Sequence, residues 1–326
     1  MFLQIKMMSA RGNQGFGGTV TMTTKKKMNY RRWLPIFLMG LPGFLYLFIN
    51  NYMPLYGLII AFKKFDYSKG IFGSPWAGLS NFKYLFATRD AFVITRNTIL
   101  YNLGFIILDT VFGVAIAIFL NEIRKKATKK IYQTFLLLPY LMSMVVVSYL
   151  AYAFLGDRTG IINAFLTHIG MQPISFYMEQ KYWPFILLFV YEWRMIGYGS
   201  IIYLATLVGI DGSFYESAEL DGATKWQQIR YITLPLLKST IIMLVTLSMG
   251  RIFRSDFGLF YQVPRNQGLL YGVTDTIDTY VFRALMKNGD IGLSSAAAFY
   301  QSIVCFITIL IFNALIRRVS KEDAMF

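Results

Sequence analysis

Long apolar runs dominate the pattern of the chain and alternate with shorter polar stretches. A hydrocarbon core about 30 Å thick requires about 20 apolar residues in a helix that rises about 1.5 Å per residue. Six runs reach this length, and they extend over Leu34–Phe62, Asn97–Leu120, Ile131–Phe154, Trp183–Val208, Ser239–Tyr261 and Leu293–Ile316. The pattern therefore predicts an all-α membrane protein with six transmembrane helices.

The distribution of Lys and Arg predicts which side of the membrane each loop occupies. Positive charge accumulates on cytoplasmic flanks. Of the 32 Lys and Arg residues, 18 lie in the terminal segments and in the loops 122–130 and 209–238. We therefore expect a multi-pass protein of the plasma membrane with both termini and these two loops in the cytoplasm.

Composition excludes several classes of protein. With 56% hydrophobic and 15% charged residues, the chain is too apolar for an ordinary soluble domain. The formal charge of +15 is explained by the cytoplasmic loops and their attraction to anionic lipid, so no nucleic acid partner is expected. Cys305 and His168 are single residues of their kinds, which excludes a disulfide framework and a Cys/His metal site. No cofactor is expected in this chain.

Polar segments flank the apolar part of the chain. Residues 1–32 are rich in Gly and Thr and lack periodicity, which predicts a disordered cytoplasmic tail. A true start at Met22 or Met28 would explain the same segment. We expect residues 33–318 to form the transmembrane domain and residues 319–326 to form a short cytoplasmic tail.

Three long segments are expected on the outer side. Segment 63–91 combines turn residues with aromatic residues, which predicts an amphipathic cap on the membrane. Segment 156–182 contains a short helical pattern through Ile161 and Phe165, which we expect to lie on the bilayer surface. Segment 262–292 is polar enough to meet a soluble partner. Simple packing over the helix ends is the alternative for all three.

The loop 209–238 is far longer than a tight turn between helices requires. Ser213 and Glu216 have the spacing of a capping box, so a helix is expected to begin with Ser213 as its N-cap. Gly222 then allows the chain to turn.

A second helix is expected after this turn. Trp226, Ile229 and Ile232 fall on one stripe, and Pro235 marks the point where the helix gives way to the fifth span. The stripe must be covered by the bilayer surface, by the ends of this chain's own helices or by another protein.

The loop resembles the EAA loop of permeases from binding-protein-dependent, ATP-driven importers. The matching pattern is Glu216-Ser217-Ala218, then Gly222, Ile232 and Leu234-Pro235, with Ser217 in place of the usual first Ala. The resemblance implies a type I importer permease in which this loop is a coupling helix seated on a cytoplasmic ATPase. The coupling residues that it implies are Glu216, Ser217, Ala218, Glu219, Asp221, Gly222, Ile232, Leu234 and Pro235.

The same resemblance implies the rest of the assembly. It predicts a second homologous permease subunit, two ATPase subunits that bind ATP and Mg, and an extracytoplasmic binding protein. The chain has no phosphate-binding Gly-x-x-x-x-Gly-Lys-Ser/Thr motif, so it is expected to be a transport subunit and no enzyme.

Other stretches narrow the resemblance to sugar permeases. Gly78–Phe82, Asn97-Thr98 and Leu138-Pro139 are similar to the maltose-type branch. Asp278–Arg283 is similar to a branch that imports oligosaccharides from complex polysaccharides. The implied function is passage of an oligosaccharide from the binding protein to the cytoplasm by alternating access.

Polar residues within the apolar runs are candidates for the cargo path, because ionisable groups in spans tend to face the bundle interior. The candidates are Asn102, Asp109, Tyr191, Glu192, Trp193, Arg194, Arg251 and Arg254. The aromatic and polar side chains among them suit sugar rings and hydroxyls, and Arg251 and Arg254 would favour an acidic sugar. The alternatives are ion pairs that orient helices, and arginines that extend to the interface.

Two other functions remain open at this point. An ion-coupled secondary transporter would use intramembrane carboxylates, for which Asp109 and Glu192 are candidates, but it would leave the EAA-like loop unexplained. A membrane enzyme would need clustered carboxylates or His at one membrane face, whereas the carboxylates of this chain are scattered and His168 is alone.

Overall fold

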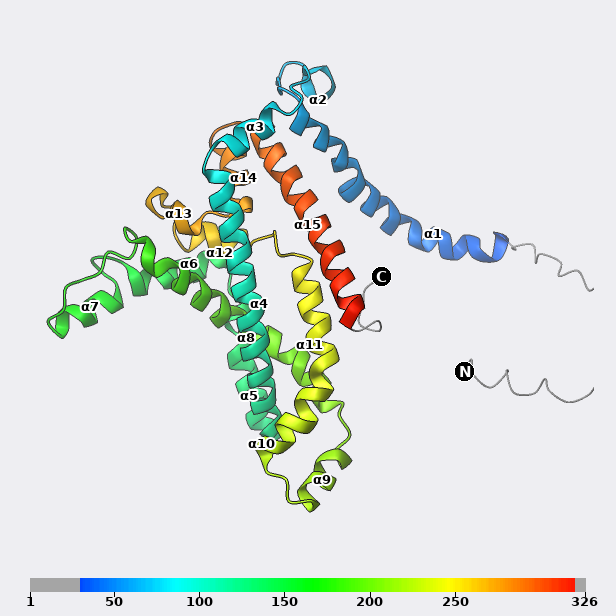
Figure 1. Ribbon diagram of the computed structural model, residues 1–326, viewed down its shortest axis with the longest axis vertical. Helices are drawn as coiled ribbons and strands as arrows, with labels where there is room; N and C mark the ends of the chain where they lie inside the picture. Colours follow the sequence, from blue (N-terminus) through cyan, green and yellow to red (C-terminus); the bar gives the residue numbers. More distant parts are fainter. Residues whose placement is uncertain (1–29, 320–326) are drawn as a thin grey trace, which may run out of the picture. The chain divides into compact units, whose positions relative to one another are not determined.

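The computed structural model describes residues 30–319 (Figure 1). These residues are helical apart from connecting loops and one isolated β-bridge between Lys63 and Trp76. The expectation of an all-α protein is confirmed for the described residues. The predictions for the N-terminal tail before Tyr30, the start at Met22 or Met28, and the tail after Val319 lie outside them.

The elements follow one another in this order: α1 (Tyr30–Leu47), a π-helical turn (Phe48–Tyr52), a 3₁₀ segment (Met53–Phe62), α2 (Gly70–Gly73), α3 (Ser80–Ala87), α4 (Asp90–Glu122), α5 (Lys126–Leu137), a 3₁₀ turn (Pro139–Leu141), α6 (Met144–Leu155), α7 (Ile161–His168), a 3₁₀ turn (Gln180–Tyr182), α8 (Trp183–Val208), α9 (Ser213–Leu220), α10 (Lys225–Gln228), a π-helical turn (Ile229–Thr233), α11 (Leu234–Met249), α12 (Phe257–Gln262), a 3₁₀ turn (Gly268–Leu270), α13 (Tyr271–Thr274), α14 (Ile277–Met286) and α15 (Ile291–Val319).

Five continuous helical stretches are long and apolar enough to cross a membrane. They are Leu34–Phe62, Asp90–Glu122, Gln180–Val208, Lys225–Met249 and Ile291–Arg318. A sixth crossing requires Lys126–Leu141 and Met144–Leu155 together, which meet at an angle of 96°. The chain is therefore a multi-pass membrane protein.

Two predicted spans differ from the observed ones. The third is bent at Pro139–Ser143, where Pro139 lacks a backbone donor and the Ser143 side chain caps α6 by accepting from the Val146 N–H. The fifth ends at Met249 rather than Tyr261, so Arg251 and Arg254 lie in the turn after the helix. The residues on both sides of the bend are apolar, so hydropathy did not locate it, whereas Gly250, Arg251 and Arg254 after Met249 were a signal for the earlier end of the fifth span.

The chain divides into two compact units, residues 1–55 and 56–326. In the first unit, the described apolar side chains from Leu34 to Leu47 are mostly exposed, as expected of a surface that faces lipid. Asn50 and Asn51 in its π-helical turn donate their side-chain amides to backbone carbonyls one turn earlier, at Tyr46 and Leu47.

In the second unit, α4 packs along α8 and contributes to all three buried apolar clusters (Figure 1). Close approach of α8 to its neighbours depends on small residues, as in other membrane bundles. A Cβ on Gly197 would lie 2.1 Å from the Leu136 carbonyl oxygen, and one on Gly199 would lie 2.6 Å from Oδ1 of Asp109. Helix α8 is therefore fixed between α4 and the end of α5.

The segments between the spans also fold. In segment 63–91 the amide of Asn81 donates to the Ala61 and Lys63 carbonyls, and Phe82 contacts the ring of Phe299 on α15. In segment 156–182 the predicted helix is confirmed as α7, whose apolar residues Ile161 and Phe165 are exposed. The placement of both segments on the bilayer surface stays a prediction.

Candidate functional site

The loop 209–238 forms two helices that meet at a corner. At the end of α9, Gly222 adopts a φ of +78°, and the Ala223 and Gly222 N–H groups donate to the Ala218 and Glu219 carbonyls. These two bonds form a Schellman motif, which requires a left-handed residue at this position and therefore favours glycine. The predicted turn at Gly222 is confirmed.

The caps of these helices differ from the prediction. Ser213 is the first residue of α9 and its side chain makes no cap; instead its N–H donates to Oδ1 of Asp211 at 3.0 Å. That bond lowers the pKa of the Asp211 carboxyl. The capping box lies at α10, where Thr224 Oγ1 accepts from the Gln227 N–H and Gln227 Oε1 accepts from the Thr224 N–H. The Thr-x-x-Gln spacing was visible in the sequence and was missed.

An ion pair spans the corner. Lys225 Nζ lies 2.7 Å from Oε1 of Glu219, so α10 is tied to the end of α9. The hydrogen bond from Lys225 lowers the pKa of the Glu219 carboxyl. Both side chains remain more than half exposed, so the pair orients the corner more than it stabilises the fold.

Large apolar side chains surround this corner without cover from the described residues. Leu220 is 89% exposed and Trp226 is 68% exposed, and Phe214 at the start of α9 is also exposed. In the predicted apolar stripe of the second helix, Trp226 is exposed, whereas Ile229 and Ile232 are half-buried. We call the three exposed side chains Phe214, Leu220 and Trp226 the corner patch.

The residues implied by the EAA resemblance lie on this loop and the helix that follows. Glu216, Ser217, Glu219, Asp221, Gly222, Leu234 and Pro235 are exposed, and Ala218 and Ile232 are half-buried. Pro235 does not end a helix, because α10, the π-helical turn and α11 form one continuous stretch from Lys225 to Met249. It lies directly after the π-helical turn, as the second residue of α11.

Besides the ion pair between Glu219 and Lys225, a second side-chain contact attaches helix α9 to this long stretch. The hydroxyl of Tyr215 lies 3.0 Å from Oγ1 of Thr233, which is buried in the π-helical turn. A displacement of α9 would therefore be transmitted to the base of α11.

Two candidate cargo residues, Asp109 and Glu192, are carboxyls on α4 and α8. Glu192 is buried, and neither of its oxygens has a hydrogen-bond partner among the described residues. Oδ1 of Asp109 is likewise unpartnered and lies where only the absence of a Cβ at Gly199 leaves room. Burial of unpaired polar atoms is costly, so these groups are candidates for function rather than packing.

The other members of the span-four candidate cluster point in different directions. Tyr191 stacks on Phe105 with centroids 3.7 Å apart, and Trp193 is partly exposed. Arg194 lies 3.5 Å from the Asp256 carboxylate of α12 and 5.8 Å from the centroid of the Tyr140 ring. Successive helical residues are about 100° apart, so the four neighbours do not form one site.

Asn102 closes the turn after α11. Its side-chain amide donates to the Ile252 and Arg254 carbonyls, both at 2.9 Å. Asn102 and Asp109 therefore share a helix face but have different surroundings. Arg251 and Arg254, which lie in that turn, are exposed.

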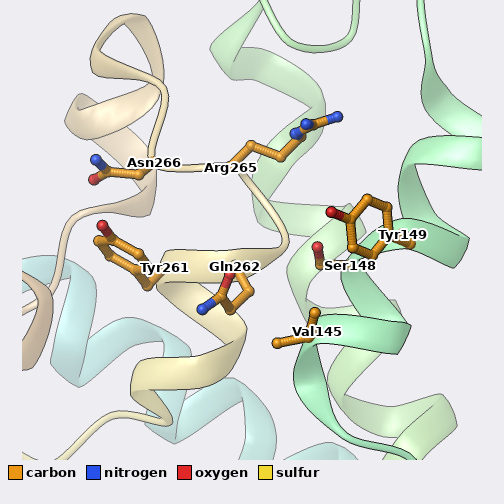
Figure 2. A pocket seen from close by; sticks show the side chains of 7 residues that line it. All are labelled: Val145, Ser148, Tyr149, Tyr261, Gln262, Arg265 and Asn266. Atoms are coloured by element: carbon orange, nitrogen blue, oxygen red, sulfur yellow. The ribbon is translucent and has the colours of Figure 1, made fainter.

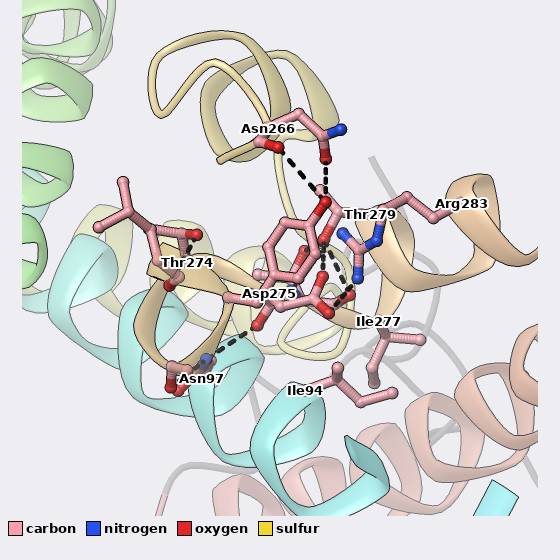
Figure 3. A network of polar contacts seen from close by, with 12 residues as sticks. Ile94, Asn97, Asn266, Thr274, Asp275, Ile277, Thr279 and Arg283 are labelled. Atoms are coloured by element: carbon pink, nitrogen blue, oxygen red, sulfur yellow. Dashed lines mark hydrogen bonds and ion pairs between the residues drawn. The ribbon is translucent and has the colours of Figure 1, made fainter. Parts of the chain in front are cut away.

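A buried polar network that the sequence did not indicate fixes α14 against α4 (Figure 3). Asp275 pairs with Arg283 and accepts from the Thr279 hydroxyl, while its carbonyl accepts from the amide of Asn97 at 2.9 Å. The Arg283 guanidinium lies 4.0 Å from the centroid of the Tyr271 ring. Burial raises the pKa of the Asp275 carboxyl, and the hydrogen bond from Arg283 opposes that rise.

The neighbouring Asp278 joins the network to α15. Its carboxylate accepts from the backbone and hydroxyl of Ser255 and from the amide of Gln301. The motif Asp278–Arg283 thus holds the segment after α11 in place.

Replacing Arg283 by glutamine is expected to destabilise the protein, because a buried carboxylate loses its partner, which costs about 3–5 kcal/mol. The double variant with Asp275→Asn should recover part of the loss. Thermal unfolding in detergent measures both. Lys181→Gln, which breaks an exposed pair with Glu179, is the matched control and should change little. If Arg283→Gln and Lys181→Gln lowered the unfolding temperature equally, this role for Arg283 would be contradicted.

Five continuous apolar helices, a bent apolar pair and the exposed bent loop are typical of a helical membrane permease. The model of the family described as the binding-protein-dependent transport system inner membrane component matches residues 109–321, and the chain belongs to this family. Proteins of this family are permease subunits of ABC importers; they catalyse no reaction, and the ATPase is a separate subunit.

Individual proteins show the same relationship. The chain is 33% identical to the polygalacturonan/rhamnogalacturonan transport system permease protein YteP of Bacillus subtilis, over 88% of this chain and 89% of that protein. It is similar to a chain in the crystal structure of a bacterial ABC transporter involved in the import of the acidic polysaccharide alginate, with a TM-score of 0.81 and 30% identity over 89% of this chain and 97% of that one.

A second structure, of a bacterial alginate ABC transporter in complex with an alginate pentasaccharide-bound periplasmic protein, gives a TM-score of 0.80 and 29% identity, covering 89% of this chain and 96% of that one. The resemblance to sugar permeases of ABC importers, including the branch for complex polysaccharides, is confirmed. Family membership therefore excludes the two other functions considered from the sequence, an ion-coupled secondary transporter and a membrane enzyme.

Proposed function

We propose that this chain forms half of the membrane pathway of an importer for acidic oligosaccharides. In this proposal a second, homologous permease forms the other half, and an extracytoplasmic binding protein delivers the cargo. Two cytoplasmic ATPases, which hold the ATP and Mg, drive alternating access. The exposed corner patch carries the proposal, because an uncovered apolar surface on a polar loop requires a partner protein.

The orientation follows from charge. In this proposal the Lys- and Arg-rich flanks favour a cytoplasmic position for the loop 209–238, the loop 122–130 and both termini. The corner patch then faces the compartment where ATP is available.

The proposed coupling element is the loop 209–238, with α9 seated in a cleft of an ATPase. Phe214, Leu220 and Trp226 supply the apolar contact, and Gly222 permits close backbone approach. Closure of the ATPases would move α9, and the contact between Tyr215 and Thr233 would pass this movement to α11. The residues Glu216, Ser217, Ala218, Glu219, Asp221, Ile232, Leu234 and Pro235 complete this element.

The nature of the cargo is supported by the relatives and by unpaired positive charge. One relative transports polygalacturonan/rhamnogalacturonan, and the structural neighbour imports the acidic polysaccharide alginate. Arg251 and Arg254 are exposed after α11 and form no ion pair with another described residue. We propose that they favour anionic sugars, with Asp109, Glu192, Tyr191, Trp193, Arg194 and Asn102 as further path candidates.

Uptake by the complete assembly tests this function. Proteoliposomes that contain both permeases and the ATPases, with the binding protein outside, are expected to accumulate tetragalacturonate only when ATP is enclosed. Ionophores that collapse proton and sodium gradients should leave uptake unchanged. Uptake that persists without ATP, or that disappears with the ionophores, would contradict the proposal.

A further inference from the structure

A cavity of about 300 Å³ lies between α6 and the segment that follows α12 (Figure 2). No sequence pattern pointed to it. Val145, Ser148 and Tyr149 of α6 line one side, and the other side is lined by Tyr261, Gln262, Arg265 and Asn266. This volume is at the lower end for small-molecule sites and accommodates about one or two sugar rings.

The backbone at this cavity is held in an unusual conformation. Arg265 and Asn266 have φ angles of 56° and 49°, in the left-handed region that residues with a side chain rarely adopt. The Asn266 N–H donates to the Tyr261 carbonyl at 3.0 Å, and the Tyr271 hydroxyl donates to Oδ1 of Asn266 at 3.0 Å. Strain of this kind persists where the surroundings enforce it, so the chain fixes the position of Arg265 at the cavity.

The charge of Arg265 lacks a partner within the part of the chain that the structure describes. Arg194 pairs with Asp256 and Arg283 pairs with Asp275, whereas Arg265 forms no ion pair with another described residue. Its guanidinium lies 4.3 Å from the centroid of the Tyr152 ring. A guanidinium that stacks on an aromatic ring keeps its N–H donors free. Their planar arrangement allows two parallel hydrogen bonds to one carboxylate.

The rest of the lining suits a carbohydrate. Tyr149 presents a largely exposed ring for stacking against the C–H face of a sugar. Ser148, Gln262 and Asn266 offer hydroxyl and amide groups for sugar hydroxyls. The cavity therefore combines one cation, aromatic surface and neutral hydrogen-bonding groups.

We propose that this cavity is a subsite for one uronate residue of an acidic oligosaccharide, with Arg265 binding the carboxylate and Tyr149 stacking on the ring. The proposal rests on the proposed function. It places a determinant of cargo charge on α6 and the segment after α12, apart from Arg251 and Arg254.

Equilibrium binding to the complete transporter in nanodiscs, without the binding protein, tests the subsite. The probes are tetragalacturonate and its fully methyl-esterified form, in which each carboxylate is replaced by an uncharged methyl ester. The wild type should bind the acid more tightly than the ester. Arg265→Gln should weaken binding of the acid about tenfold or more and leave the ester unchanged.

Three further variants separate charge from structure. Arg265→Lys should fall between the wild type and Arg265→Gln, because it keeps the charge and loses the fork. Tyr149→Ala should weaken binding of acid and ester alike. Arg158→Gln, which removes an exposed arginine elsewhere in segment 156–182, should bind both as the wild type does.

Equal binding of acid and ester by the wild type, or unchanged acid binding by Arg265→Gln, would overturn the subsite, as would failure of the wild type to bind either. The proposed function is judged separately by ATP-dependent uptake. Uptake by the wild type together with unchanged binding by Arg265→Gln would reject the subsite alone.

Discussion

Replacing Gly222 by valine is expected to abolish ATP-dependent uptake, lowering its initial rate about a hundredfold or more, which corresponds to about 2.7 kcal/mol. A residue with a Cβ is strained at a φ of +78°, and a β-branched residue more than most. A Cβ at this position would have open space within the chain, so the damage should be confined to the corner and its partner. Uptake and ATPase activity in proteoliposomes measure the effect.

Two variants isolate the cause of that loss. Gly170→Val introduces the same residue at a φ of +79°, also into open space, but in segment 156–182, and it should leave uptake nearly unchanged. Gly222→Asn introduces a side chain, but asparagine tolerates the left-handed region. This variant should therefore retain more uptake activity than Gly222→Val. Uptake at the wild-type level with Gly222→Val would remove the corner from the coupling mechanism.

The second large effect is expected for Leu220→Glu. Leu220 is 89% exposed in this chain, so the substitution should not change the chain's own stability. If the ATPase covers this side chain, binding loses about 1.5–3 kcal/mol of apolar burial and also buries an unpaired charge. The affinity for the ATPase should therefore fall about a hundredfold or more.

Co-purification of the permeases with the ATPases measures this loss directly. Leu79→Glu alters another exposed leucine, in segment 63–91, and serves as the matched control. It should retain the ATPases at the wild-type level. Retention of the ATPases by Leu220→Glu would show that the corner patch faces lipid or another surface.

Several features of the fold could be predicted from sequence because each depends on local chemistry. The apolar runs predicted the five continuous apolar helices and the bent pair that would form a sixth crossing. The turn at Gly222 follows from the need for a left-handed residue in a Schellman motif. The family could be predicted as well, because residue types and spacing in the loop reflect contacts made within one continuous segment.

Other features depend on contacts distant in sequence and were not predictable. The bend at Pro139–Ser143 lies within an apolar stretch. Helix α11 ends at Met249, and a tertiary contact between the Asn102 amide and the Ile252 carbonyl holds the turn that follows. The predicted Ser213 cap is wrong because the N-cap position falls one residue earlier, at Gly212, and the Glu216 N–H donates to the Gly212 carbonyl.

The candidate cargo path was the least predictable part. Tyr191, Glu192, Trp193 and Arg194 are adjacent in sequence, but the helix distributes them over different surroundings. The network of Asp275 and Arg283 reaches Asn97 on α4, and the cavity at Arg265 includes residues of α6, so both join segments far apart along the chain. No sequence pattern connects their members before the fold brings them together.

Site-specific photo-crosslinking in native membranes tests the role of the loop most directly. A photoreactive amino acid placed at Leu220 should crosslink to the ATPase subunit, and the yield should change when ATP is trapped in the closed state. The same probe at Leu79 should give no crosslink to the ATPase. Absence of an ATPase crosslink from Leu220 in an assembly that transports its cargo would contradict the assignment of loop 209–238 as the coupling element.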